Sequence, residues 1–185
     1  MMLTSKHPKA KSCEVCERVF VPDRIGQVVC RPACAMARVR QAKKAERESV
    51  RARKEAIKTL ADLKREAQTA MNRWIVQIRD ADKPCISCGR HHQGQWHAGH
   101  YLSRGSAPQH ALNPMNVWKQ CAPCNTYLHG NLIPYRVRLI ELIGLEAVEA
   151  MENDNAPRKW TRDGLIEVRD TYRAKLKQIQ KGEPC

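Results

Sequence analysis

Cysteines are the first residues in this sequence whose type and spacing point to chemistry, and eight of the nine form four close pairs. The pairs are Cys13-x-x-Cys16, Cys30-x-x-x-Cys34, Cys85-x-x-Cys88 and Cys121-x-x-Cys124. Four thiolates saturate a tetrahedral zinc ion and leave no open position for a reaction. We therefore expect two structural zinc sites, and disulfide or redox use of the cysteines is the alternative.

Histidines and asparagines form a second chemically competent group, placed between and just after the last two cysteine pairs. The strand-like run from Gln95 to Tyr101 carries His97 and His100. A neutral imidazole can accept a proton from water at neutral pH, which is the task of a general base in phosphodiester hydrolysis. The amide oxygen of an asparagine suits magnesium or manganese, which would stabilise negative charge on a phosphate. Taken alone, Asn116 and Asn125 are equally compatible with turns or helix caps.

The overall charge points to a polyanionic partner. The 185 residues carry a formal net charge of +14, and lysines and arginines that neutralise phosphates release condensed counterions. No run approaches the roughly 20 apolar residues of a membrane span, and the first residues have no apolar core of secretory length. We expect a cytoplasmic, DNA-binding protein without membrane association.

The elements that must position these residues divide the chain into four parts. Residues 1–37 predict a small zinc ribbon, and residues 38–83 a long basic helix, since no Gly or Pro occurs from Ala33 to Lys83. Residues 84–132 form the second zinc-stapled module, and residues 133–185 predict helices with a break at Gly144. The last of these helices starts after Thr161 and ends at Gly182. The expected fold class is α+β and mostly helical.

The long helix has two halves of different character. Its first half carries basic residues that can contact phosphate or remain solvated, among them Arg38, Arg40, Lys43 and Lys44. Its second half carries an apolar stripe at helical spacing, formed by Ile57, Leu60, Ala67, Met71, Trp74 and Ile78. The stripe predicts packing against another part of the chain, against a second copy, or both.

The order of the polar residues resembles the motif of the HNH (ββα-metal) nucleases. In that family a β-hairpin and a short helix hold one divalent ion, and a structural zinc often clamps the same module. The resemblance implies that His100 is the general base and that Asn116 orients the loop and the base. It also implies that His97, where many relatives carry Asp, and Asn125 are ligands of the catalytic ion, with His129 as a further ligand or a phosphate contact. Arg104 and Lys119 flank this site and are predicted phosphate contacts.

The whole arrangement, from the Cys13 module through His97-Ala-Gly-His100-Tyr to Cys121-Ala-Pro-Cys124-Asn125, resembles the NinG (Rap) family of lambdoid phages. That resemblance implies a recombination endonuclease in the host cytoplasm that cuts branched DNA, including Holliday junctions and D-loops, and works beside other recombination proteins. A junction offers two symmetric strands, which favours a homodimer, with the helix from Ile57 to Ile78 as the candidate interface. The alternatives are a zinc-containing accessory protein that binds DNA without cutting it, and a sequence-specific homing or restriction nuclease.

Overall fold

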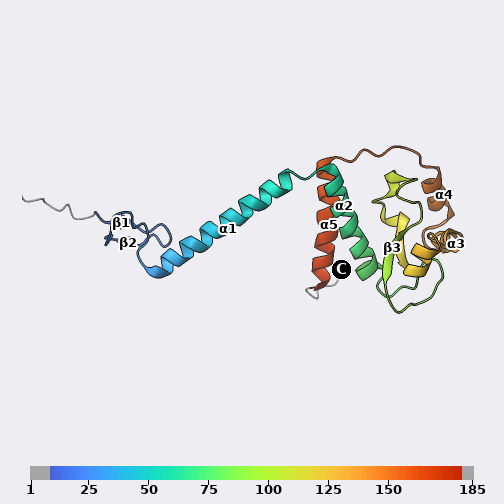
Figure 1. The fold of residues 1–185 in the computed structure, drawn as a ribbon, viewed down its shortest axis with the longest axis horizontal. Helices are drawn as coiled ribbons and strands as arrows, with labels where there is room; N and C mark the ends of the chain where they lie inside the picture. The colour runs from blue at the N-terminus through green and yellow to red at the C-terminus, as the bar shows by residue number, and fades with distance from the viewer. Residues whose placement is uncertain (1–8, 181–185) are drawn as a thin grey trace, which may run out of the picture. The chain divides into compact units, whose positions relative to one another are not determined.

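The computed structural model describes residues 9–180 and divides the chain between Lys58 and Thr59 into two compact units (Figure 1). The predicted boundaries differ from this division, because residues 59–83, expected to belong to a linking helix, are part of the second unit. The predicted helix end at Gly182 and the unpaired Cys185 lie outside the described residues.

The first unit is a cysteine-rich hairpin followed by a helix. Strands β1 (Lys11–Ser12) and β2 (Val19–Phe20) are antiparallel, with Lys11 opposite Phe20. Helix α1 (Pro32–Ala56) begins with a proline, which is well suited to a first helical turn because its missing N–H would be unpaired there anyway. Cys34 is the buried residue of α1, so the rest of the helix is solvated, as its charge pattern indicates.

The prediction of one continuous helix from Ala33 to Lys83 is wrong, because α1 ends at Ala56 and α2 (Leu60–Trp74) begins after a short break. Thr59 and Asp62 form a capping box at the start of α2. The hydroxyl of Thr59 accepts from the backbone N–H of Asp62 at 3.1 Å, and the carboxylate of Asp62 accepts from the N–H of Thr59 at 3.1 Å. These contacts pair backbone donors that a new helix start leaves free, so the break needs neither Gly nor Pro.

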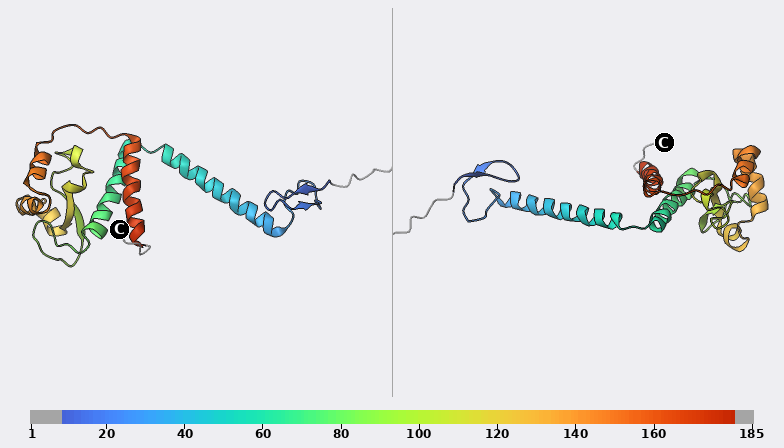
Figure 2. Two further views of the ribbon diagram at one scale, coloured as in Figure 1. Left: turned by 180° about the vertical axis from the view of Figure 1, so that it is seen from behind. Right: turned by 90° about the horizontal axis from the view of Figure 1, so that it is seen from above.

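Helix α2 continues into a π-helical turn, η1 (Ile75–Arg79), and packs along α5 (Arg162–Gln180). The two helices lie side by side in each view (Figure 2). Thr161 caps α5 as predicted, since its hydroxyl accepts from the N–H of Gly164 at 3.1 Å. The core between them contains Leu63, Ala67, Met71 and Ile75 of α2 with Leu165 and Tyr172 of α5.

The apolar stripe is therefore used within the chain, and its register differs from the prediction. Met71 is fully buried against the α5 side of the core, whereas Ile57 and Leu60 are exposed. The helix from Ile57 to Ile78 consequently does not offer the continuous apolar surface that the predicted dimer interface requires.

Two strands form the sheet of the second unit. Strands β3 (Trp96–His100) and β4 (Val117–Cys121) are antiparallel, from Trp96 opposite Cys121 to His100 opposite Val117. The connection between them contains two 3₁₀ turns, η2 (Pro108–His110) and η3 (Pro114–Asn116). A π-helical segment, η4 (Pro123–Tyr127), follows β4 directly.

Helices α3 (Leu132–Ile143) and α4 (Leu145–Asn153) lie across the sheet from α2 and α5 (Figure 1). They are separated at Gly144, as predicted, where φ is +86° and a side chain would be strained. The second core lies here and contains Ile86, Tyr101, Trp118, Tyr135, Leu139, Val148 and Met151. Between residues 9 and 180 no helix is long and apolar enough to cross a membrane.

Candidate functional site

The first predicted cysteine set is brought together by the β1–β2 hairpin and the start of α1. The ligand atoms of Cys13, Cys16, Cys30 and Cys34 all lie within 4.8 Å of one another. The sulfur atoms of Cys30 and Cys34 are 3.8 Å apart, and those of Cys16 and Cys30 are 3.4 Å apart. A tetrahedral ion with zinc–sulfur bonds of about 2.3 Å needs sulfur–sulfur edges of about 3.8 Å. This set can therefore hold a zinc ion.

The second cysteine set joins three elements of the second unit. Cys85 and Cys88 come from the loop after η1, Cys121 is the last residue of β4, and Cys124 lies in η4. The sulfur atoms of Cys88 and Cys121 are 3.9 Å apart, and the N–H of Cys121 donates to the sulfur of Cys85 at 3.4 Å. This set also has tetrahedral dimensions, and a zinc ion in it would fix the sheet against η4.

His97 and Asn125 meet at the junction of the sheet and η4. The side-chain nitrogen Nδ2 of Asn125 lies 2.8 Å from Nδ1 of His97, across 28 positions of sequence. His129 is exposed in the turn that follows η4. No hydrogen bond within residues 9–180 joins His129 to either of them, and the groups of three or more His, Cys, Asp or Glu found there are the two cysteine sets. The structure thus assembles two of the three predicted ligands of a catalytic ion.

His100 ends β3 and has a different environment from His97. Its Nε2 lies 3.2 Å from the carbonyl oxygen of Ala111, and because that oxygen only accepts, a neutral ring donates from Nε2 and carries its lone pair on Nδ1. Burial lowers the pKa of His100 below 6.5, and the positive charge of Arg104 lowers it further, against the opposing effect of the Ala111 carbonyl. The backbone of Ala98 also interacts with the ring and opposes this lowering of its pKa. His100 is therefore neutral at neutral pH.

The two histidines are three residues apart on one strand, so they point to opposite faces of the sheet. β3 pairs with β4 along one edge, and no strand of the described chain pairs with its other edge.

Asn116 is a positioning residue. It is fully buried, its amide oxygen accepts from the N–H of Leu102 at 2.7 Å, and its amide nitrogen donates to the carbonyls of Leu102 at 3.0 Å and His110 at 3.1 Å. These contacts close the loop between β3 and β4, which carries Arg104 and Ala111. Asn116 thereby holds the residues around His100 and has no surface for a substrate.

The predicted phosphate contact at Lys119 is contradicted. Lys119 is only 6% exposed, and its ammonium group donates to the carbonyl of Ala81 at 2.5 Å and lies 4.3 Å from the ring centre of Trp96. All five residues of β4 are buried, so a lysine there packs along its length and satisfies its charge internally.

The other predicted DNA contacts lie at the surface. Arg104 is exposed in the loop between β3 and β4. On α1, Arg40 and Lys43 are exposed, whereas Arg38 pairs with Glu14 at 3.0 Å and Lys44 lies 4.0 Å from Glu48. Both of these pairs are solvent-exposed and contribute little to stability, so phosphate can replace the carboxylate.

Gly99 is a packing position that the sequence did not single out. A Cβ atom at Gly99 would lie 2.1 Å from the amide oxygen of Gln120. The amide nitrogen of Gln120 donates to the carbonyl of Gly130 at 2.5 Å and to the hydroxyl of Ser87 at 2.6 Å, and so fixes the turn after η4 to the sheet. A glycine within a strand is a known sign of such a close approach.

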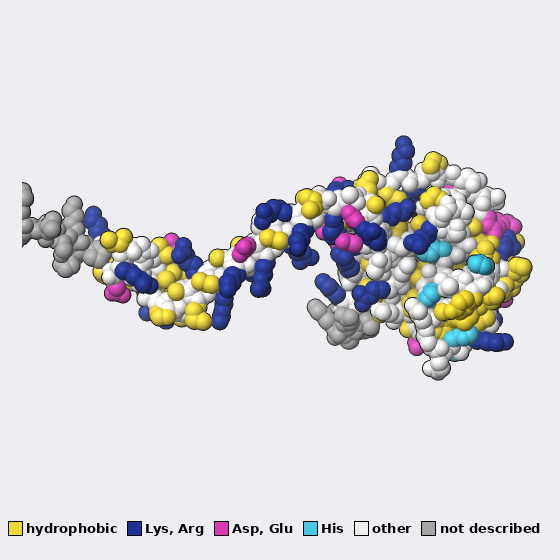
Figure 3. Space-filling model, in the orientation of Figure 1, with side chains coloured by type: hydrophobic (Ala, Val, Ile, Leu, Met, Phe, Trp, Pro, Cys, Tyr) yellow, Lys and Arg dark blue, Asp and Glu magenta, His cyan; other side chains and the backbone are white. Residues whose placement is uncertain are grey.

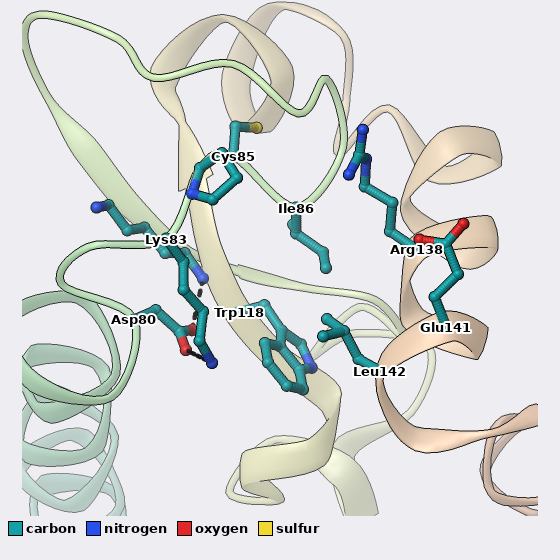
Figure 4. Close-up of a pocket in the computed structure, with 10 residues that line it drawn as sticks. Asp80, Lys83, Cys85, Ile86, Trp118, Arg138, Glu141 and Leu142 are labelled. Carbon is teal, nitrogen blue, oxygen red and sulfur yellow. Dashed lines mark hydrogen bonds and ion pairs between the residues drawn. The ribbon is translucent and has the colours of Figure 1, made fainter.

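A separate pocket of about 250 Å³ lies between residues 80–86, β4 and α3 (Figure 4). The ring of Trp118 forms one side of it, and Arg138 and Glu141 lie opposite. Burial raises the pKa of Asp80 beside the pocket, but hydrogen bonds and positive charges from Arg79 and Lys83 outweigh burial, so the pKa lies below its ordinary value. Neither His97 nor His100 lines this pocket.

Comparison with known proteins places the whole chain in one group. The family model described as "Bacteriophage Lambda NinG protein" matches residues 5–183. Protein ninG of Salmonella phage P22 is 36% identical over 186 residues, covering 90% of this chain and 91% of that protein. Protein ninG of Escherichia phage lambda is 35% identical over 199 residues, covering 97% of each. No solved structure matches the chain. The chain therefore belongs to the NinG family of bacteriophage proteins.

Proposed function

We propose that this protein is a metal-dependent endonuclease that hydrolyses phosphodiester bonds in branched DNA, such as Holliday junctions and D-loops, during phage recombination. The observation that carries the proposal is the contact between His97 and Asn125 at the junction of a two-stranded sheet and η4. The cysteine set of Cys85, Cys88, Cys121 and Cys124 clamps the same elements from outside. This order of strand, strand and helix is similar to the ββα-metal motif.

His97 and Asn125 are the proposed ligands of a magnesium or manganese ion, with His129 as a third ligand or a phosphate contact. An imidazole nitrogen in the ligand set favours manganese over magnesium, whereas an amide oxygen accepts either ion. When bound, the ion would supply positive charge to stabilise the phosphate as it gains negative charge.

His100 is the proposed general base. Its lowered pKa, and the lone pair on Nδ1 of a ring that donates from Nε2 to Ala111, support proton abstraction from a water molecule. Along a strand, three residues span about 10 Å, so a phosphate at the open edge of β3 can lie between His100 and an ion held by His97. Arg104 is placed to contact the same phosphate backbone.

Recognition of branched DNA by its backbone and shape is supported by the net charge of +14. A four-way junction has paired strands to cut, so we propose a homodimer with two sites. Its interface lies outside the α2 face that packs on α5. Light scattering of the purified protein measures whether it is a dimer.

The test uses a labelled four-way junction and a linear duplex of the same sequence, each incubated with magnesium, manganese or a chelator. The expected result is cleavage of the junction with either ion, none with the chelator, and little cleavage of the duplex. Junction binding without cleavage under every condition overturns the nuclease and favours an accessory DNA-binding protein. Cleavage of the duplex at one sequence favours a homing or restriction nuclease.

A further inference from the structure

Helix α2 has a polar face as well as the apolar face that packs on α5. Residues on this polar face recur at intervals of three and four, as expected for one side of a helix. They line a groove of about 560 Å³, within the roughly 300–1,000 Å³ of ligand clefts. The lining consists of Ala61, Lys64, Arg65, Gln68, Thr69 and Asn72 on α2, with Arg104, Gly105 and Ala111 on the opposite wall.

The charge of the groove is wholly positive. Lys64, Arg65 and Arg104 line it and no carboxylate does. Arg65 pairs with Asp62 on the same helix, whereas Lys64 and Arg104 make no ion pair within the described chain. Two basic side chains on facing walls, from elements 40 residues apart, form an anion-binding arrangement that a single solvated helix face would not.

The polar floor of the groove is fixed in place. Gln68 is 6% exposed, and its amide nitrogen donates to the amide oxygen of Asn72 at 2.8 Å. Amide and hydroxyl groups beside lysine and arginine are the usual partners of phosphate and sugar oxygens in DNA complexes.

The groove ends beside His100. Ala111 lines it and its carbonyl oxygen contacts the ring of His100. Arg104 also lines it and is close enough to lower the pKa of His100. Lys and Arg side chains gather over α2 and α5, with some Asp and Glu side chains among them, and extend toward histidine side chains on the face drawn in Figure 3.

We infer that this groove binds the phosphate backbone of the DNA strand whose phosphodiester bond is presented to His100, an inference that rests on the proposed function for the role of His100. Lys64 and Arg104 each contact a phosphate from one wall. The face of α2 opposite its core thereby becomes the DNA-binding surface of the second unit, and the loop between β3 and β4 is tied by Asn116 to form the other wall.

The test measures binding of a labelled four-way junction by fluorescence anisotropy at several salt concentrations, with chelator present to prevent cleavage. The double variant Lys64→Gln/Arg104→Gln is compared with Lys159→Gln/Lys177→Gln, which removes the same charge from exposed residues of the same unit outside the groove. Zinc content and circular dichroism establish that both variants fold.

The groove variant should bind at least tenfold more weakly, and the slope of log affinity against log salt should fall by about 1.4–1.8, since each lost phosphate contact removes about 0.7–0.9. The control variant should lose less than threefold in affinity.

An equal loss of affinity in both variants, or an unchanged salt slope, would overturn the proposal that the groove binds DNA. If the wild type cleaves no DNA but the groove variant alone loses affinity, the proposed nuclease fails while the groove stands as a DNA-binding site. If the wild type cleaves the junction and the groove variant binds and cleaves it equally well, the proposed nuclease is supported and the groove is refuted as a DNA-binding site.

Discussion

Nδ1 of His97 and Nδ2 of Asn125 lie 2.8 Å apart and join β3 to η4, while the second cysteine set joins the loop after η1, the end of β4 and η4. Neither side chain is needed to fill a core, and both are half-buried. Asn125 can donate this hydrogen bond to Nδ1 of His97, and the proposed metal chemistry requires that the same two side chains also offer ligand atoms to one ion.

Exchange of His97 for a carboxylate should change the preferred ion. In His97→Asp the ligand becomes a hard oxygen, so the ratio of cleavage rates in magnesium and manganese should rise by about fivefold or more. Asn125→Leu keeps a similar volume but has no ligand atom, and should lose cleavage by 100-fold or more with either ion. An unchanged metal ratio in His97→Asp would remove His97 from the ligand set.

Zinc content should follow the two cysteine sets. Elemental analysis of the purified protein should give about two zinc ions per chain, and Cys13→Ser or Cys85→Ser should each give about one. Cys85→Ser should also lower the melting temperature of the second unit and abolish cleavage, because its site fixes the sheet against η4. Cys185→Ser is the matched control and should retain both ions. Two zinc ions in Cys85→Ser would contradict the assignment.

Loss of Asn116 should destabilise the loop that carries Arg104 and Ala111. Asn116→Ala removes three hydrogen bonds and leaves the half-buried N–H and carbonyl of Leu102 without these partners, while the carbonyl of His110 keeps the N–H of Asn113 at 3.1 Å. The loss should cost about 2–4 kcal/mol of unfolding free energy. Asn113→Ala is the control in the same loop, since the side chain of Asn113 accepts one backbone N–H, from Met115, at 3.0 Å. Its cost should be about 1 kcal/mol. Equal denaturation midpoints for the two variants would show that Asn116 does not hold the loop.

The cysteine sets, the α+β class, the β3 strand, the Gly144 break and the Thr161 cap follow from local chemistry, and the sequence predicts them. The break before α2 was missed because it depends on a side-chain cap at Thr59 and not on Gly or Pro. For the same reason the predicted apolar stripe places Ile57 and Leu60 on the same face as Met71, whereas both are exposed in the structure.

The burial of Lys119 and the groove along α2 could not be predicted because both depend on tertiary packing. β4 is buried over its whole length, which the alternation of its residues does not reveal. The groove combines Lys64 with Arg104, and only the packing of α2 against the loop between β3 and β4 brings them to one site.

The pH dependence of cleavage should report the environment of His100. Only the neutral ring can accept a proton, so the single-turnover rate should rise with pH and reach a plateau, with a midpoint below 6.5 because burial and Arg104 lower the pKa of His100. Arg104→Gln removes one lowering charge and should move the midpoint to higher pH, whereas Lys64→Gln, with the same charge loss, should move it less. Saturating protein separates this effect from binding. A wild-type midpoint above 6.5 would contradict the assigned environment.

The central claim is that metal-dependent hydrolysis by this protein uses His100 as the base. The most direct measurement is single-turnover cleavage of a labelled four-way junction in manganese by the wild type and by His100→Ala, with zinc content and junction affinity measured on the same samples. The account predicts a loss of 100-fold or more in rate, with two zinc ions retained and affinity changed by less than threefold. Cleavage by His100→Ala at the wild-type rate, or no cleavage by a wild type that holds zinc and binds the junction, would contradict it.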